Sequence, residues 1–137
     1  MNVEKLIEFA DQARENAYTP YSHFRVGAAL LCEDGTIYTG CNIENAAYGP
    51  SNCAERTAVF KAVSEGKRRF RAIAIIGDSQ DITSPCGVCR QVLSEFCGPE
   101  FVIIMCNTQK QYRQATLGEL LPYSFGADTI KEYNLVT

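Results

Sequence analysis

Residues 72–106 read AIAIIGDSQDITSPCGVCRQVLSEFCGPEFVIIMC and contain the clearest fold signal in the chain. The apolar runs 72–76 and 101–106 show no polar alternation, which is typical of strands that are buried on both faces. A helical stretch over 86–96 separates them and ends before the helix-stopping pair Gly98-Pro99. This order predicts two parallel neighbouring strands, with the helix packed over the sheet that contains them.

The segments before this stretch continue the pattern. Residues 53–65 predict a helix with an apolar face, and Gly66 provides its C-terminal stop. The apolar runs 26–32 and 36–41 flank an Asp-Gly pair at Asp34-Gly35, a strong signal for a hairpin turn. We therefore expect an antiparallel hairpin followed by a helix.

The two ends of the chain give weaker patterns. Apolar residues recur at helical spacing from a candidate N-cap at Asn2 through Tyr18, so a first helix is expected there. Near the other end, 111–116 is a candidate polar edge strand and 117–121 a candidate short helix. Together the elements predict an α/β fold with a mixed sheet, in a single domain over residues 1–137.

Composition limits the partners and the compartment. The net charge is -3 and the sequence pI about 5.2, which gives no electrostatic reason to bind nucleic acid. The chain lacks an apolar run of the length that a signal peptide or a membrane span requires, so no membrane partner is expected. Seven cysteines at irregular spacing favour a reducing compartment, and we expect a cytoplasmic location. Four of them lie in or beside apolar runs and receive no role, namely Cys32, Cys41, Cys97 and Cys106.

The other three cysteines fall at the predicted starts of two helices. One motif is Cys53-Ala54-Glu55 and the other is Pro85-Cys86-Gly87-Val88-Cys89. A helix N-terminus favours the thiolate form of cysteine, and thiolates bind zinc. Cys86 and Cys89 share a helical face, and a crossover in an α/β fold can bring Cys53 beside them. The sequence therefore predicts one zinc ion held by Cys53, Cys86 and Cys89.

Three protein ligands leave one position of tetrahedral zinc for water, as in catalytic sites. Three thiolates and Zn²⁺ sum to -1, so Arg56 is expected to compensate by drawing electron density from Cys53 and keeping the bound water acidic. Glu55 stands at i+2 from Cys53 and points to another side of the helix. We expect it to face the water as a general base and then a general acid, and not to bind the metal.

Other readings of these residues remain open. The Cys86 and Cys89 pair alone suits a redox Cys-x-x-Cys motif in a disulfide exchanger, and the cysteines could be buried core thiols. Glu55 alone could be an exposed first-turn carboxylate favoured by the helix dipole. The same cysteines could also brace a non-catalytic zinc module. The combination of Cys53, Glu55 and Arg56 at one helix start with Cys86 and Cys89 at the next favours a catalytic zinc site.

With these residues in place, the chain resembles the small homotetrameric zinc-dependent cytidine deaminase family over nearly its full length. The specific part is the pair of zinc segments 52–57 (NCAERT) and 84–91 (SPCGVCRQ), a signature of zinc nucleobase deaminases. Residues 21–29, 40–45 and 120–126 also resemble segments of the family. The resemblance implies a three-layer α/β/α fold with a mixed sheet of about five strands and one Zn²⁺ per chain.

The resemblance also implies a reaction. Free cytidine and deoxycytidine would be hydrolysed to uridine and deoxyuridine in pyrimidine salvage, with zinc-bound hydroxide attacking C4 and Glu55 shuttling the protons. The implied substrate contacts are Asn42 and Glu44 on the ribose hydroxyls, Phe24 against the nucleoside, the Ala54 N–H on the pyrimidine carbonyl and the Ser84 carbonyl on the departing amino group.

In the family's homotetramer, Tyr48 and Phe125 would reach into a neighbouring subunit's site. From the residues alone, Asn42 and Glu44 are ordinary turn residues after a strand, and Phe24 is more typical of a core position. Another aminated heterocycle, such as blasticidin S or a base within nucleic acid, is an alternative substrate. Glu44 favours a ribose, and the acidic net charge disfavours a polymer.

Overall fold

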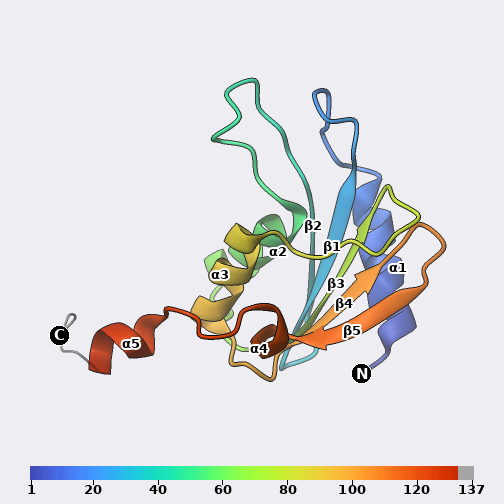
Figure 1. Cartoon of the computed structure of the whole chain (residues 1–137). Coiled ribbons are helices and arrows are strands. Elements are labelled where there is room, and N and C mark those ends of the chain that lie inside the picture. Colours follow the sequence, from blue (N-terminus) through green and yellow to red (C-terminus); the bar gives the residue numbers. More distant parts are fainter. Residues whose placement is uncertain (133–137) are drawn as a thin grey trace.

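The computed structural model of the chain describes residues 1–132 and contains a five-stranded sheet with helices on both faces (Figure 1). The predicted domain reaches residue 137, so its residues 133–137 lie outside the described residues. The strands are β1 (Val26–Cys32), β2 (Ile37–Cys41), β3 (Phe70–Gly77), β4 (Val102–Cys106) and β5 (Tyr112–Thr116). The helices are α1 (Val3–Arg14), α2 (Ala54–Ser64), α3 (Gly87–Phe96), α4 (Leu117–Leu120) and α5 (Ala127–Glu132).

The sheet has the order β2-β1-β3-β4-β5 and is mixed. β3 and β4 pair in parallel across the α3 crossover, whereas β1 pairs antiparallel with both β2 and β3, and β5 antiparallel with β4. The predicted α/β fold with a mixed sheet is therefore confirmed. The hairpin between β1 and β2 turns at Gly35, whose φ of 92° lies in the left-handed region that glycine adopts without strain.

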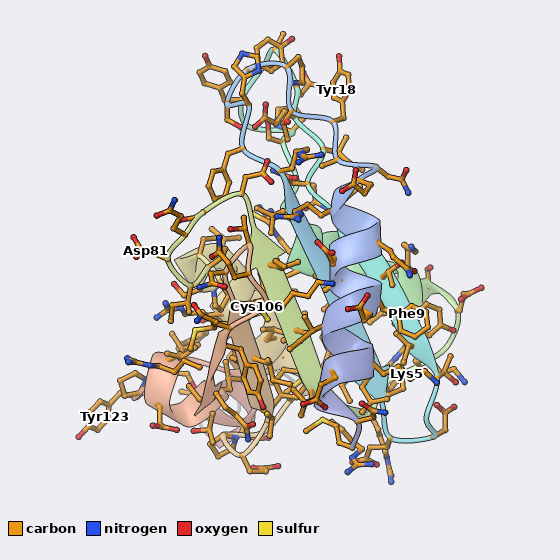
Figure 2. The ribbon with its side chains drawn as sticks, turned by 90° about the vertical axis from the view of Figure 1, so that its right-hand side faces the viewer. Lys5, Phe9, Tyr18, Asp81, Cys106 and Tyr123 are labelled. Atoms are coloured by element: carbon orange, nitrogen blue, oxygen red, sulfur yellow. The ribbon has the colours of Figure 1, made fainter. Side chains whose placement is uncertain are left out.

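Three layers result from side chains that alternate between the two faces of the central strands. On one face, Ile73 and Ile75 of β3 belong to the cluster that packs against α2 and α3. On the other face, Ala74 and Ile76 pack against α1, which lies in front of the sheet in Figure 2. The backbone of α1 comes so close that a Cβ at Gly27 would lie 2.0 Å from the carbonyl oxygen of Ala10. The expected α/β/α arrangement is confirmed.

Several expected boundaries are corrected by tertiary contacts. The first helix ends at Arg14, because the backbone N–H of Tyr18 donates to the Asn42 carbonyl at 3.0 Å and the chain bridges Ile43 there. The expected strand over 72–76 is longer at both ends, and α5 was not predicted at all. Within residues 1–132 no helix combines the length and the apolar character needed to cross a membrane.

The sheet order explains why two helix starts meet. β2 and β3 are both antiparallel to β1, so they run in the same direction, and the helices that follow them, α2 and α3, begin at the same end of the sheet. Helix α2 packs directly on β2, since a Cβ at Gly40 would lie only 2.5 Å from the Ala54 carbonyl oxygen. The fold therefore brings the N-cap residues Cys53 and Cys86 together.

Candidate metal centre and active site

Three thiols from two helix starts meet at this end of the sheet. The Sγ atom of Cys86 lies 3.7 Å from that of Cys53 and 3.5 Å from that of Cys89, and all three sulfurs lie within 4.8 Å of one another. Ligands at about 2.3 Å from a tetrahedral zinc ion are themselves roughly 3.8 Å apart, so the spacing fits one ion. Cys53, Cys86 and Cys89 are thus positioned to bind a single Zn²⁺.

The surroundings favour the thiolate form of Cys53. Cys53 and Cys86 are the N-caps of α2 and α3, so both residues stand at the positive ends of helices. Neither side chain makes a capping hydrogen bond to its own helix. The Arg56 guanidinium donates to Cys53 Sγ at 3.2 Å. A hydrogen bond from Cys89, followed by the one from Arg56, lowers the pKa of Cys53 to about 5. Donation to Cys53, together with burial, raises the pKa of Cys89.

Glu55 is a buried carboxyl group beside the cysteines. It sits in the first turn of α2 with 4% of its surface exposed, and burial raises its pKa to about 7. A carboxyl group with a pKa near neutrality can both accept and donate a proton at physiological pH. It lines a cavity of about 170 Å³ whose walls come from β1, the end of β2, α2 and the loop before α3. The lining residues are Val26, Asn42, Cys53, Ala54, Glu55, Thr83, Ser84 and Cys86.

This cavity collects several residues that the sequence predicted. Asn42, Ala54 and Ser84 line it together with two of the cysteines and Glu55. Two further lining residues, Val26 and Thr83, were not predicted. Thr83 directly precedes Ser84, so its place in the same loop was the available signal, whereas Val26 looked only like the first residue of a strand.

Glu44 and Tyr48 line a second cavity, of about 340 Å³, with Tyr21, Ser22, Asn45 and Ser51. The Glu44 carboxylate accepts the backbone N–H groups of Tyr21 and Ser22, both at 3.0 Å, and the Ser22 hydroxyl. These bonds, the Ser22 hydroxyl first, lower the pKa of Glu44. The Tyr21 and Tyr48 rings meet edge to face with centroids 6.3 Å apart. Glu44 therefore anchors the segment that begins at Tyr21.

Asn42 anchors the continuation of the same segment. Its Oδ1 accepts the Val26 N–H and its Nδ2 donates to the Phe24 carbonyl, both at 2.8 Å. Phe24 is 36% exposed and its ring lies beside Gly77, outside the set of cavity-lining residues. Phe125 is also outside that set; it is exposed, and its carbonyl accepts from Gln91 of α3 at 2.8 Å.

The chain is similar to cytidine deaminases in sequence and structure. A family model described as the cytidine and deoxycytidylate deaminase zinc-binding region matches residues 1–105. A cytidine deaminase of Sporosarcina psychrophila is 54% identical over 95% of this chain and 96% of its own length. One of Halalkalibacterium halodurans is 50% identical over 96% of this chain and all of its own. The crystal structure of a Burkholderia pseudomallei cytidine deaminase, 49% identical, superposes with a TM-score of 0.88 over 91% of this chain and 100% of that one.

These matches cover the two motifs and the fold that carries them. The family model spans all three cysteines, and the structural relative shares the arrangement of the sheet and its helices. The prediction of a zinc-binding chain is confirmed by the family and by the cysteine geometry. This chain belongs to the zinc-binding cytidine deaminase family.

Proposed function

We propose that this chain hydrolyses free cytidine and deoxycytidine to uridine and deoxyuridine with release of ammonia, a step of pyrimidine salvage. One observation carries the proposal: the buried Glu55 shares a cavity with Cys53 and Cys86, two of the three cysteines whose sulfurs fit one zinc ion. A proton carrier and a metal site facing the same space are what hydrolysis of an aromatic amine requires. The relatives named above are cytidine deaminases.

Different residues would bind the metal, transfer protons and compensate the thiolate charge. Cys53, Cys86 and Cys89 would hold Zn²⁺, which as a Lewis acid supplies activation of the attacking water. Glu55 takes one proton from that water and delivers it to the ring nitrogen. It then takes the second proton from the hydroxyl group added at C4 and delivers it to the departing amine, which leaves as ammonia while the carbonyl forms. Arg56 donates to Cys53 and offsets part of the thiolate charge.

The remaining site residues would bind the nucleoside. The Ala54 N–H at the start of α2 would donate to the pyrimidine carbonyl, and the Ser84 carbonyl would accept from the amino group. Asn42 and Glu44 would exchange some of their present bonds for the ribose hydroxyls, while the half-exposed Phe24 ring packs against the nucleoside. The described residues that line the two cavities include no lysine or arginine, which favours a nucleoside over a nucleotide.

Assembly belongs to the same proposal. Tyr48 and Phe125 are 77% and 59% exposed, which is unusual for large aromatic side chains and suits groups that complete a neighbouring subunit's site in a homotetramer. The one sheet with its two helical layers supports a single domain. The odd number of cysteines supports a cytoplasmic location.

The test is turnover of cytidine by the purified chain with one zinc ion bound. Turnover is measured as the loss of ultraviolet absorbance of the cytosine ring. We expect turnover of cytidine and deoxycytidine, no turnover of deoxycytidylate, and loss of activity in Glu55→Gln. Absence of any change with zinc bound overturns the proposal. Turnover of blasticidin S but not of cytidine would make blasticidin S the substrate in place of cytidine. A fourth protein ligand on the metal would favour a non-catalytic zinc module. Absence of zinc with a reversible disulfide would favour a disulfide exchanger.

A further inference from the structure

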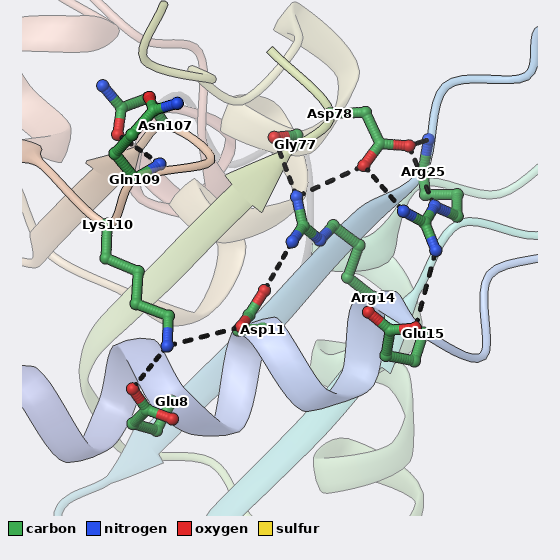
Figure 3. Close-up of polar contacts among 10 residues, drawn as sticks. All are labelled: Glu8, Asp11, Arg14, Glu15, Arg25, Gly77, Asp78, Asn107, Gln109 and Lys110. Atoms are coloured by element: carbon green, nitrogen blue, oxygen red, sulfur yellow. Dashed lines mark hydrogen bonds and ion pairs between the residues drawn. The ribbon is translucent and has the colours of Figure 1, made fainter. Parts of the chain in front are cut away.

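Asp78 follows β3 and joins two arginines from other parts of the fold (Figure 3). Its Oδ1 accepts from Arg14 at 3.2 Å and from Arg25 NH2 at 3.3 Å. Its Oδ2 accepts from Arg25 Nε at 2.9 Å and from the Arg25 backbone N–H at 3.0 Å. The side chains of Arg14, Asp78 and Arg25 are 11%, 23% and 41% exposed, so water competes weakly for the Arg14 bond and more strongly for the Arg25 side-chain bonds. We call Arg14, Arg25 and Asp78 the Asp78 cluster.

The Asp78 cluster ties three segments together through the backbone as well. The Asp78 N–H donates to the Arg25 carbonyl at 3.0 Å, and Arg14 donates to the Gly77 carbonyl at 3.3 Å. Arg14 is in turn held by Asp11, one turn earlier in α1, at 2.7 Å. The end of α1, the residue before β1 and the end of β3 are therefore fixed relative to one another.

The segment that the cluster holds is the one that presents Phe24. Asn42 holds Phe24 and Val26 from the β2 side, and Asp78 holds Arg25 between them from the β3 side. The Phe24 ring rests on Gly77, where an added Cβ would lie 2.9 Å from ring atom Cε1. Asp78 does not line the cavity, so it reaches a nucleoside only through this segment.

We propose that Asp78 is a positioning residue for substrate binding: through Arg25 it fixes the backbone from which Phe24 meets the nucleoside. The inference rests on the proposed function, because it takes Phe24 as a nucleoside contact. A packing contact that is equally good in the ground state and the transition state affects KM and leaves kcat unchanged. Loosening the Phe24 segment should therefore weaken nucleoside binding without slowing the chemical step.

The experiment compares steady-state deamination of cytidine by zinc-loaded variants. Arg25→Gln is the first variant, because it removes the side-chain bonds to Asp78 and leaves the Arg14 pair in place; Asp78→Asn is the second. We expect KM to rise about fivefold to tenfold in both, with kcat within about twofold of the parent. Glu15→Gln is the matched control: its carboxylate also pairs with Arg25, at 3.6 Å, but is 65% exposed, so KM should stay unchanged.

A double-mutant cycle with Phe24→Ala separates positioning from a general structural role. If Asp78 acts through the Phe24 ring, Arg25→Gln should raise KM in the parent and have no further effect once Phe24 is alanine. A KM that is unchanged in both Arg25→Gln and Asp78→Asn, or a rise that persists in the Phe24→Ala background, overturns the inference. If the parent does not deaminate cytidine, the proposed function fails first, whereas an active parent with insensitive variants contradicts this inference alone.

Discussion

Replacing Glu55 with glutamine should stabilise the metal-free protein above neutral pH while it removes activity. Glu55 is 4% exposed, and burial raises its pKa from 4.5 to about 7. Between these pH values the folded chain binds more protons than the unfolded chain, so stability falls as the pH rises. At about 1.4 kcal/mol per pH unit, the full loss above pH 7 is about 3 kcal/mol. Glutamine has nearly the same shape and no charge, so the variant avoids this loss.

The assay is urea unfolding in the presence of a chelator and a reductant at pH 4, 6 and 8. The free energy of unfolding of Glu55→Gln should equal that of the parent near pH 4 and exceed it by about 3 kcal/mol at pH 8, with the same denaturant dependence. Added Zn²⁺ should narrow the gap, since a divalent cation near a carboxyl group favours its ionised form. Turnover should fall by roughly 10²-fold to 10⁴-fold, the usual contribution of a general acid–base group.

Glu44→Gln is the control with the opposite sign. Hydrogen bonds from Ser22 lower the pKa of Glu44, so its carboxylate form stabilises the fold at neutral pH and that stabilisation is lost as the pH falls. Glu44→Gln should therefore be less stable than the parent at pH 7. Two results would refute the reasoning about burial. One is a stability difference between Glu55→Gln and the parent that does not vary with pH, and the other is a parent that is more stable than Glu55→Gln at pH 8.

Three other substitutions test separate contacts. Arg56→Ala removes the cation that donates to Cys53 Sγ, so the acidic limb of the pH–rate profile should move up by about one pH unit; an unchanged limb would contradict a tuning role. Asp78→Asn should cost about 2 kcal/mol at pH 7 by urea unfolding. Burial alone would raise the pKa of Asp78, but hydrogen bonds from Arg25 and the positive charges of Arg25 and Arg14 lower it. This cost should therefore vanish as the pH falls well below about 3.9, and a cost that is constant with pH would contradict the role of the ion pairs. Gly40→Ala should destabilise the fold by about 3 kcal/mol, because its Cβ would lie 2.5 Å from the Ala54 carbonyl oxygen; a neutral effect would mean that α2 can shift away.

The predictable parts of the site are those that depend on local chemistry. Cys53 and Cys86 stand at helix starts because a loop precedes an apolar helical pattern in each case, and the structure makes both of them N-caps. The three-residue spacing of Cys86 and Cys89 places both sulfurs on one side of α3. The position of Glu55 beside the cysteines follows from its place in the first turn of α2, two residues after the N-cap Cys53. Short-range geometry determines each of these positions, so the sequence is sufficient to predict them.

Long-range contacts account for what the sequence did not reveal. The first helix ends at Arg14 because Tyr18 hydrogen-bonds to Asn42 across the fold, and such a partner leaves no trace in helical periodicity. The Asp78 cluster is equally invisible, since Asp78 stands 64 residues after Arg14 and 53 after Arg25 and any one of the three reads as an ordinary surface charge. Thr83 lines the cavity because its loop returns to the sheet, where the Thr83 N–H donates to the carbonyl of Cys106 at the end of β4, at 3.1 Å.

The sequence by itself determined that this chain has a zinc-binding set of cysteines, with a glutamate two positions after one of them, on an α/β scaffold, because residue type and helix or strand periodicity are local properties. Only the tertiary structure decided that Glu55 shares one cavity with Cys53 and Cys86. β1 lies between β2 and β3 and is antiparallel to both, so β2 and β3 run in the same direction. The helices that follow them, α2 and α3, therefore begin close together. The tertiary structure likewise decided that Glu55 is buried. The atoms that the fold gathers around its carboxyl group exclude water, and this burial raises its pKa.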